Sequence, residues 1–392
     1  MLTRSVLTAC LLGASCLVAP TACAEDPATR TEALQTQWSV RGAAGLDAIL
    51  FVGMLSGDVL QSHYYPEEIA EFRSRLPQAA LDALARIDQR MRVEAGGLAG
   101  PSLVYLFSAA PFETMDDVIA TARDPEQFVR PNIDQLISWH DGDYEEKVVN
   151  LPDVLLVLEA LREAEFEAWY AENYTAEIEA GVAATRAAVT PYDIIPEQAR
   201  LLGRALDPMI EIRIVAFSLP YGIRIAGQRF MAHYSYPADI QLRVAAHEIF
   251  HPPFNLADEG LRASLAPLAQ DPWMRSIVEN HDPARGYNSF EGLMNEGSTQ
   301  ALDQIVSERL GFAREPGPRW GDHDGGMHML AAALYHAMKE DGFDVSGGRY
   351  EDWLRSAIAR GMLAPDEVRR RARAIVGDAP VQYWYDVMET VE

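Results

Sequence analysis

Residues 210–215 read IEIRIV, residues 229–234 read RFMAHY, and residues 247–251 read HEIFH. In the first segment isoleucines alternate with charged residues, which is the pattern of a strand that buries one face. Turn residues at 219–222 (LPYG) and at Gly227 separate a short alternating segment, 223–225, from the second quoted segment. These three segments predict a small antiparallel sheet, and the helix that follows the sheet carries HEIFH.

The helix after the sheet is bounded by prolines at both ends. Pro237 suits a first helical turn, and Ser235 is the expected N-terminal cap. At the other end Pro252 and Pro253 follow His251 directly, and a proline disfavours helical geometry in the residue before it. We therefore expect the helix to end at His251.

HEIFH is a complete H-E-x-x-H motif, in which the two histidines are four residues apart. That spacing places both imidazoles on one helix face, where they can bind a single tetrahedral zinc ion. Glu248 then lies beside the open position of the metal, where a carboxylate can act as a general base toward water and later protonate a leaving amine. The motif predicts zinc as the cofactor, His247 and His251 as ligands, and Glu248 as a catalytic residue.

A catalytic zinc site requires a third protein ligand. The metzincin pattern needs Gly and His shortly after the motif, but Phe254 and Ala257 occupy those positions and exclude that class. Residues 295–297 read NEG within a helical pattern, and here the chain resembles the gluzincins, the thermolysin-like and aminopeptidase-like zinc peptidases. The resemblance covers residues 210–335, and it implies that Glu296, on a second helix, is the third ligand.

Other groups compete for the roles around the metal. The gap from His251 to Glu296 is longer than in the common gluzincins, which implies an inserted loop or helix. The family also places a carboxylate one turn after the ligand glutamate to hold the first histidine; Gln300 stands there, and Asp303 is the alternative. Four residues remain alternative third ligands: Asp258, Glu259, His281 and Asp282.

Attack on a carbonyl bound to zinc develops negative charge, so a hydrogen-bond donor is expected beside the metal. Residues 322–328 (DHDGGMH) resemble the Gly-Gly-x-His element of thermolysin-like enzymes, which implies that His328 is this donor. The family has an aspartate five positions earlier, where His323 stands in this chain. Tyr287 and Tyr335 are the alternatives, since related enzymes use a tyrosine for the same task.

Most of the remaining sequence has helical periodicity. It extends over residues 31–206 and is clearest at 76–91, 154–170 and 174–189, with a short strand expected at 103–107 and a break at 190–196. We therefore predict an α+β fold, predominantly helical, with a zincin-like core in which a small antiparallel sheet precedes the HEXXH helix and a second ligand-bearing helix. The expected regions are 1–24 (signal peptide), 25–195 (N-terminal, helical), 196–345 (zincin-like core) and 346–392 (C-terminal, helical).

The first 24 residues have the pattern of a secretory signal peptide. Arg4 provides the positive start, residues 6–18 are apolar and small, and Ala22-Cys23-Ala24 offers a cleavage site. We expect an exported protein, periplasmic or secreted, with a lipid anchor at Cys23 as the competing possibility. All three cysteines lie in this segment, so the metal ligands of the mature chain are restricted to histidines and carboxylates.

The chain is strongly acidic. Its net charge of −25 becomes −26 when Arg4 is removed with the signal peptide, which disfavours binding to nucleic acid or anionic lipid. No apolar run approaches the roughly 20 residues that span a bilayer. Together with the motif, these observations predict an exported zinc metallopeptidase, a hydrolase whose partner is a peptide or protein substrate. The alternatives are a catalytically inactive zincin-fold binding protein and a zinc hydrolase of a non-peptide amide or ester.

Overall fold

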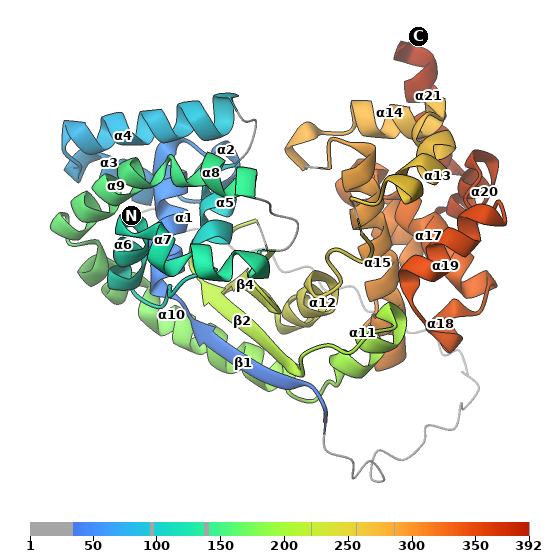
Figure 1. Ribbon diagram of the computed structural model, residues 1–392, viewed down its shortest axis with the longest axis horizontal. Helices are drawn as coiled ribbons and strands as arrows, with labels where there is room; N and C mark the ends of the chain where they lie inside the picture. Colours follow the sequence, from blue (N-terminus) through green and yellow to red (C-terminus); the bar gives the residue numbers. More distant parts are fainter. Residues whose placement is uncertain are drawn as a thin grey trace, which may run out of the picture. The chain divides into compact units, whose positions relative to one another are not determined.

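The computed structural model of the chain describes residues 34–94, 98–136, 141–220, 222–255, 257–285 and 287–391 (Figure 1). The expected signal peptide, its cleavage site and Cys23 lie outside these residues. The described part belongs to one compact unit, Leu34–Glu392. None of its helices is long and apolar enough to cross a membrane. The predicted boundaries at residues 195 and 345 stay predictions.

Four short strands form one mixed sheet with the order β1-β2-β4-β3. The strands are β1 (Gln37–Gly42), β2 (Met209–Val215), β3 (Ile223–Ile225) and β4 (Arg229–His233). The predicted antiparallel arrangement is wrong for most of the sheet, because β1–β2 and β2–β4 are parallel pairs and only β3–β4 is antiparallel. Alternation shows which face of a strand is buried, but it carries no information on the direction of the neighbouring strand. After β2 the chain passes to β3 at the far edge, and β4 then lies between β2 and β3.

Strand β1 lies in a region for which the sequence predicts helices. Its residues, QWSVRG, are mostly polar, and Val40 is its one buried residue. A half-exposed edge strand of this composition has little local pattern, so its identity depends on pairing with β2, where Val40 lies opposite Ile212. The sheet is therefore completed by residues far away in the sequence.

The helices before β2 agree with the predominantly helical prediction: α4 with η2 covers the helix expected at 76–91 and α10 that at 174–189, but the helix expected at 154–170 is interrupted. Glu165, at φ 61°, separates α9 from α10. The elements are α1 (Ala44–Ser56), α2 (Val59–Ser62), α3 (Pro66–Arg75), α4 (Gln78–Asp88), η2 (Gln89–Glu94), α5 (Ala99–Phe107), α6 (Met115–Arg123), α7 (Pro125–Phe128), η3 (Arg130–Gln135), α8 (Asp141–Val148), α9 (Leu151–Glu163), α10 (Phe166–Val189) and α11 (Ile194–Leu202).

The strand predicted at 103–107 is wrong, because these residues form the second half of helix α5. A short apolar run that is buried on all sides does not distinguish a strand from a helix. Helix α5 packs closely on α1: a Cβ atom on Gly53 would lie 2.3 Å from the Cα atom of Gly100. Two glycines at one crossing thus allow the two helix backbones to touch.

Helix α1 is also tied to the end of the sheet. The buried carboxylate of Asp47 accepts hydrogen bonds from the backbone N–H groups of Ala216 (2.8 Å) and Phe217 (2.9 Å), directly after β2. The hydroxyl of Tyr170 on α10 donates to the same carboxylate. The N-terminal helices and the sheet are therefore joined by a polar contact as well as by their apolar surfaces.

The elements after β4 carry most of the residues expected at the metal. They are α12 (Ala238–Glu248), α13 (Glu259–Ala269), α14 (Pro272–Asn280), η4 (Pro283–Arg285), α15 (Phe290–Leu310), α16 (Pro316–Gly321), η5 (His323–Gly326), α17 (Met329–Glu340), α18 (Phe343–Ser346), α19 (Tyr350–Ala359), α20 (Pro365–Val376) and α21 (Asp378–Val391). The insertion expected between His251 and Glu296 thus contains the two helices α13 and α14.

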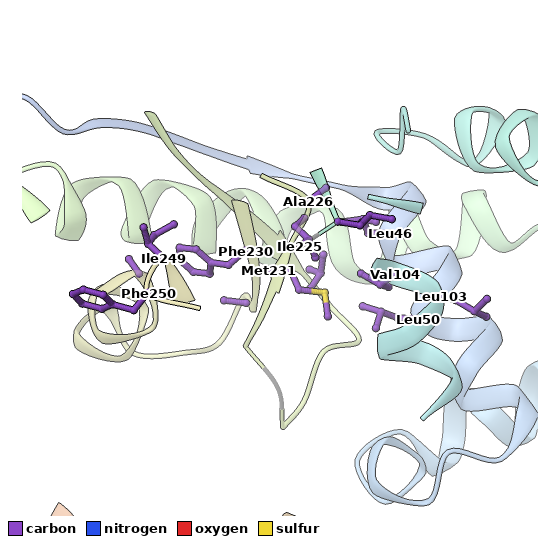
Figure 2. Packing of buried hydrophobic residues seen from close by; sticks show 14 of the residues in the cluster. Leu46, Leu50, Leu103, Val104, Ile225, Ala226, Phe230, Met231, Ile249 and Phe250 are labelled. Carbon is purple, nitrogen blue, oxygen red and sulfur yellow. The ribbon is translucent and has the colours of Figure 1, made fainter. Parts of the chain in front are cut away.

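One buried apolar cluster includes residues from the helices before β2 and from the elements after β4. Figure 2 shows side chains of this cluster from α1, α5, the β3–β4 hairpin and the residues after α12, among them Leu50, Val104, Met231, Ile249 and Phe250. Ile249 and Phe250 are the two middle residues of HEIFH that lie between Glu248 and His251. The motif is therefore anchored on its apolar side by the core.

Candidate metal centre

Helix α12 ends earlier than the sequence predicts. Its last helical residue is Glu248, and the next residues continue in a tighter turn, in which the N–H groups of Phe250 and His251 donate to the carbonyls three residues before them (3.0 and 3.3 Å). The turn still brings the two rings together, with Nε2 of His251 3.0 Å from Nε2 of His247. Ser235 does not cap α12, because its hydroxyl bonds to Nδ1 of His233 instead (2.7 Å).

Arg224 on β3 stabilises this early helix end. Its guanidinium donates to the carbonyl oxygens of Glu248 (3.3 Å), Ile249 (3.2 Å) and His251, and also to that of Gly227 (3.0 Å). Carbonyls at a helix C-terminus lack partners within the helix and attract a positive charge. Arg224 therefore holds the turn that carries His251.

Glu296 lies in the interior of α15 and completes a group of three ligand atoms. Its Oε2 is 3.5 Å from Nε2 of His247 and 3.4 Å from Nε2 of His251. A tetrahedral ion with bonds of about 2.0–2.1 Å holds its ligand atoms about 3.3 Å apart. The three separations fit such an ion, and Oε2 is buried without a hydrogen-bond partner among the described residues. The cluster could therefore hold a metal ion.

The charges around the cluster favour a cation. Burial by itself would raise the pKa of Glu296, but the imidazoles of His247 and His251 lower it well below the usual value. Burial opposes a proton on His247, yet the carboxylates of Glu296 and Asp303 raise the pKa of this histidine well above its usual value. Carboxylates that stabilise a proton here would also stabilise a bound metal ion.

A second layer of contacts orients His247. Its Nδ1 lies 2.7 Å from Oδ2 of Asp303, and Arg319 on α16 binds both oxygens of that buried carboxylate (2.5 and 2.9 Å). The structure thus places Asp303, and not Gln300, against the histidine. Gln300 instead donates to Oε1 of Glu296 (2.8 Å) and accepts from the indole N–H of Trp320 (2.7 Å).

The second histidine has its own neighbours on α15. Nδ1 of His251 lies 3.2 Å from the amide nitrogen of Asn295 and 3.3 Å from the hydroxyl of Thr299. Asn295 precedes the ligand and Thr299 is one turn beyond it, so a single helix supplies one ligand and orients another. In the sequence, Asn295 and Thr299 are only two polar residues of a helical pattern, and nothing there indicates that they contact His251.

Glu248 lies next to the cluster and is almost fully buried. Its Oε2 accepts a hydrogen bond from the backbone N–H of Arg224 on β3 (2.9 Å). Burial raises its pKa, and the nearby imidazoles of His247 and His251 oppose this shift. A carboxyl whose pKa is raised toward neutrality is suited to accept and release a proton.

The candidate hydrogen-bond donors occupy different places. His328 is buried at the start of α17, where its ring contacts the Gln300 amide (3.2 Å) and Oδ2 of Asp324 (3.1 Å). The ring of Tyr287 lies 6.5 Å from that of His328. Burial of the Tyr287 phenol and the charges of Glu296 and Glu248 raise its pKa well above the usual value. The hydroxyl of Tyr335 bonds to Glu308 (2.5 Å) instead.

The backbone has an unusual conformation at Tyr287 and in the turn that precedes His328. Tyr287 has φ 60°, which is uncommon outside glycine and marks functional sites more often than ordinary loops. Asp324 has φ 51° and is followed by two glycines with φ 67° and 73°, so the chain turns sharply just before His328. The Gly-Gly pair is what permits this turn.

The alternative third ligands lie elsewhere. Asp258 caps α13 by accepting from Leu261 N–H (2.7 Å), and Asp282 pairs with Arg285 (3.7 Å). Nδ1 of His281 lies 2.9 Å from the carbonyl of Ile277. Within the described part of the chain, the ligand cluster contains Glu296 and none of these groups, nor Glu259.

Comparison of the chain with models of protein families, with curated proteins and with solved structures finds no match. The resemblance to gluzincins therefore rests on the residues of the metal centre alone. For the same reason, the function has to be argued from the geometry and chemistry of those residues.

Proposed function

We propose that the chain is a zinc-dependent peptidase with a gluzincin-like centre. One observation carries the proposal. His247, His251 and Glu296 present three ligand atoms at the separations that a tetrahedral zinc site requires, and Glu248 lies beside them. Zinc in such a site polarises a substrate carbonyl and makes water acidic near neutral pH. The chain itself supplies the base, the ligands and their orientation.

Each nearby residue has a separate task in this proposal. Glu248 takes a proton from the attacking water and later gives it to the leaving amine, while the Arg224 backbone N–H holds its carboxylate in place. Asp303 fixes the orientation of the His247 ring. The phenol of Tyr287 or the imidazole of His328 stabilises the negative charge that develops on the carbonyl oxygen.

Two candidate donors beside the cluster favour catalysis over the alternative of an inactive binding protein. Of the two, His328 is separated from the Glu296 carboxylate by Gln300, whereas the pKa of the Tyr287 phenol is raised by the charge of that carboxylate as well as by burial. Loss of one such donor lowers kcat by about 10²–10³-fold in other hydrolases. We therefore expect that loss for Tyr287→Phe and a smaller one for Tyr335→Phe, its matched control on α17.

The main test pairs metal content with activity. Purified wild type should contain about one zinc ion per chain, and Glu296→Ala should lose it, while Glu291→Ala in the first turn of the same helix keeps it. On a mixed peptide library, Glu248→Gln should lose about 10²–10⁴-fold in rate but retain zinc. Glu259→Gln is the control for this change.

Two results would contradict the proposal. Full zinc occupancy in Glu296→Ala would remove the third ligand from the assignment. Unchanged peptide cleavage by Glu248→Gln would show that the hydrolysis, if it comes from this chain, does not use the proposed base.

A further inference from the structure

A cavity of about 260 Å³ lies directly beside the candidate metal centre. It is lined by one face of α12, by α15 and by the segment from Arg314 to His328. His247 and Glu248 form part of its wall, so any group bound in the cavity lies next to the candidate ligand and the candidate base. Its volume is below the roughly 300–1,000 Å³ of pockets for drug-sized ligands, which favours one residue or chain end as its occupant.

Three arginines line this cavity: Arg243, Arg314 and Arg319. Arg319 is buried, and its guanidinium donates to both carboxylate oxygens of Asp303. Arg243 pairs with Asp239 (2.7 Å), a carboxylate that is 62% exposed, so this pair is weak and easily exchanged. Arg314 has no hydrogen-bond or ion-pair partner for its side chain among the residues that the structure describes. It is exposed at the edge of the cavity.

The unpaired state of Arg314 is unexpected in this chain, which has 58 acidic and 33 basic residues. Partial burial of its guanidinium lowers the pKa of Arg314, repulsion from Arg319 and Arg243 lowers it further, and the charges of Asp303 and Asp239 act in the opposite direction. The two aspartates that line the cavity already have basic partners: Asp303 binds Arg319, and Asp324 binds Arg285 (2.9 Å). Arg314 therefore adds to the wall of the cavity that also contains Glu248 a positive charge that no carboxylate among the described residues pairs directly.

We propose that Arg314, assisted by Arg243, binds a carboxylate of the substrate next to the metal centre. This inference rests on the proposed peptidase function and adds the class of substrate to it. A guanidinium binds a carboxylate through two parallel N–H···O bonds, which provide orientation as well as affinity. The carboxylate is either the C-terminus of a peptide, which would make cleavage occur near that end, or an aspartate or glutamate side chain near the cleaved bond.

The test uses zinc-loaded full-length protein and three short N-acetylated peptides. They share one sequence and differ in having a free C-terminal acid, a C-terminal amide, or an amide with one internal Asn replaced by Asp. Binding is measured by calorimetry on the Glu248→Gln background, so that no cleavage is needed, and kcat/KM is measured on the wild-type background.

We expect wild type to prefer one carboxylated peptide over the plain amide, and Arg314→Gln to reduce this preference by about 10–100-fold. Arg309→Gln is the matched control, because Arg309 is an exposed residue on α15 that pairs with Glu197 (2.7 Å). Preference for the free acid identifies the C-terminus, and preference for the Asp peptide identifies a side chain; either result supports the inference.

Equal binding of all three peptides by wild type would overturn the inference, and so would a preference that survives in Arg314→Gln. Failure of the proposed function is distinct from both outcomes, because it appears as missing zinc or as cleavage that does not depend on Glu248. The binding measurement remains informative in that case, since it does not require hydrolysis.

Discussion

The candidate metal ligands come from α12 with the turn after it and from α15, which hold them in opposite ways. On α12 the second histidine lies beyond the last helical residue, and its position depends on Arg224 from another element. On α15 the ligand lies in the interior of a helix of 21 residues, with a side chain that is only 5% exposed. The recognisable motif is thus on the less regular support, and the ligand with the weaker sequence signal is on the more regular one.

The largest expected effect comes from the contact that joins the two helices. Asp303→Ala removes the partner of His247 and leaves Arg319 buried without a counter-charge, which should cost about 3–5 kcal/mol of stability. Zinc affinity should fall by about 10–100-fold through the loss of the histidine's orientation. Chemical denaturation and competition with a zinc chelator measure the two quantities.

Because Asp303→Ala could fail to fold, Asp303→Asn provides a second, milder test of the same contact. The amide keeps the shape and one oxygen, so most of the stability should remain while zinc affinity still falls. Equal zinc affinity in Asp303→Asn and wild type would show that the orientation of His247 does not depend on this carboxylate.

The second largest effect is expected from the contact of Arg224 with the end of α12. Arg224→Met should lower the free energy of unfolding by about 2–3 kcal/mol, because several carbonyls at the helix end lose a charged donor. It should also weaken zinc binding, since His251 lies in this turn. Arg229→Met is the control: Arg229 also donates to carbonyls, those of Ala226 (2.7 Å) and Ser108 (3.0 Å), but to none in α12. A similar loss of zinc affinity in both variants would refute a specific role for Arg224.

The beginning of α12 can be tested through pH. His233 ends β4, and its carbonyl accepts from Gln241 of α12 (3.0 Å). Burial lowers the pKa of His233 to about 4, from 6.5 in the unfolded chain, so its contribution to stability is present above pH 6.5 and is lost as the pH falls toward 4. Between pH 7 and 5 this loss amounts to about 2 kcal/mol.

His233→Gln should lack this part of the pH dependence. The quantity to compare is the difference between the two proteins in the free energy of unfolding at each pH. Burial raises the pKa of Asp47 to about 7, which shifts stability in the opposite direction, but this carboxyl is present in both proteins and cancels. Parallel curves for the two proteins would mean that His233 titrates normally.

The smallest effect concerns an alternative ligand. Asp258→Ala removes the N-terminal cap of α13 and should cost about 1 kcal/mol. Because Asp258 lies outside the ligand cluster, the zinc content should not change. Loss of zinc in this variant would reopen the choice of the third ligand.

The parts that were predictable from sequence are those that depend on near neighbours. Strands β2, β3 and β4 follow from alternation over a few residues, and the proximity of His247 and His251 follows from their spacing. The direction of β4 and the existence of β1 depend on pairing with distant strands, which no local pattern encodes. Asn295-Glu296-Gly297 pointed to the third ligand only through a resemblance to known peptidases.

The supporting residues were the least predictable. In the sequence Arg224 is only the middle residue of a short alternating segment, and its contact with the end of α12 depends on how the β3–β4 hairpin packs. Arg319 on α16 reaches Asp303 on α15, a contact between two helices that periodicity cannot reveal. In the sequence, only Pro252 and Pro253 directly after His251 indicate that the end of this helix needs a contact from another element.

The parallel pairing of β1 with β2 constrains how the proposed activity could be controlled. Many proteases are made as zymogens and released when an N-terminal inhibitory segment is cut and leaves. Here Gln37–Gly42 is a strand of the same sheet that precedes α12, and Asp47 binds the end of β2. A cut between these elements would leave both pieces held together, and separation would expose the edge of β2 as a template for aggregation. The proposed peptidase could therefore not lose its N-terminal half without also losing a strand of this sheet.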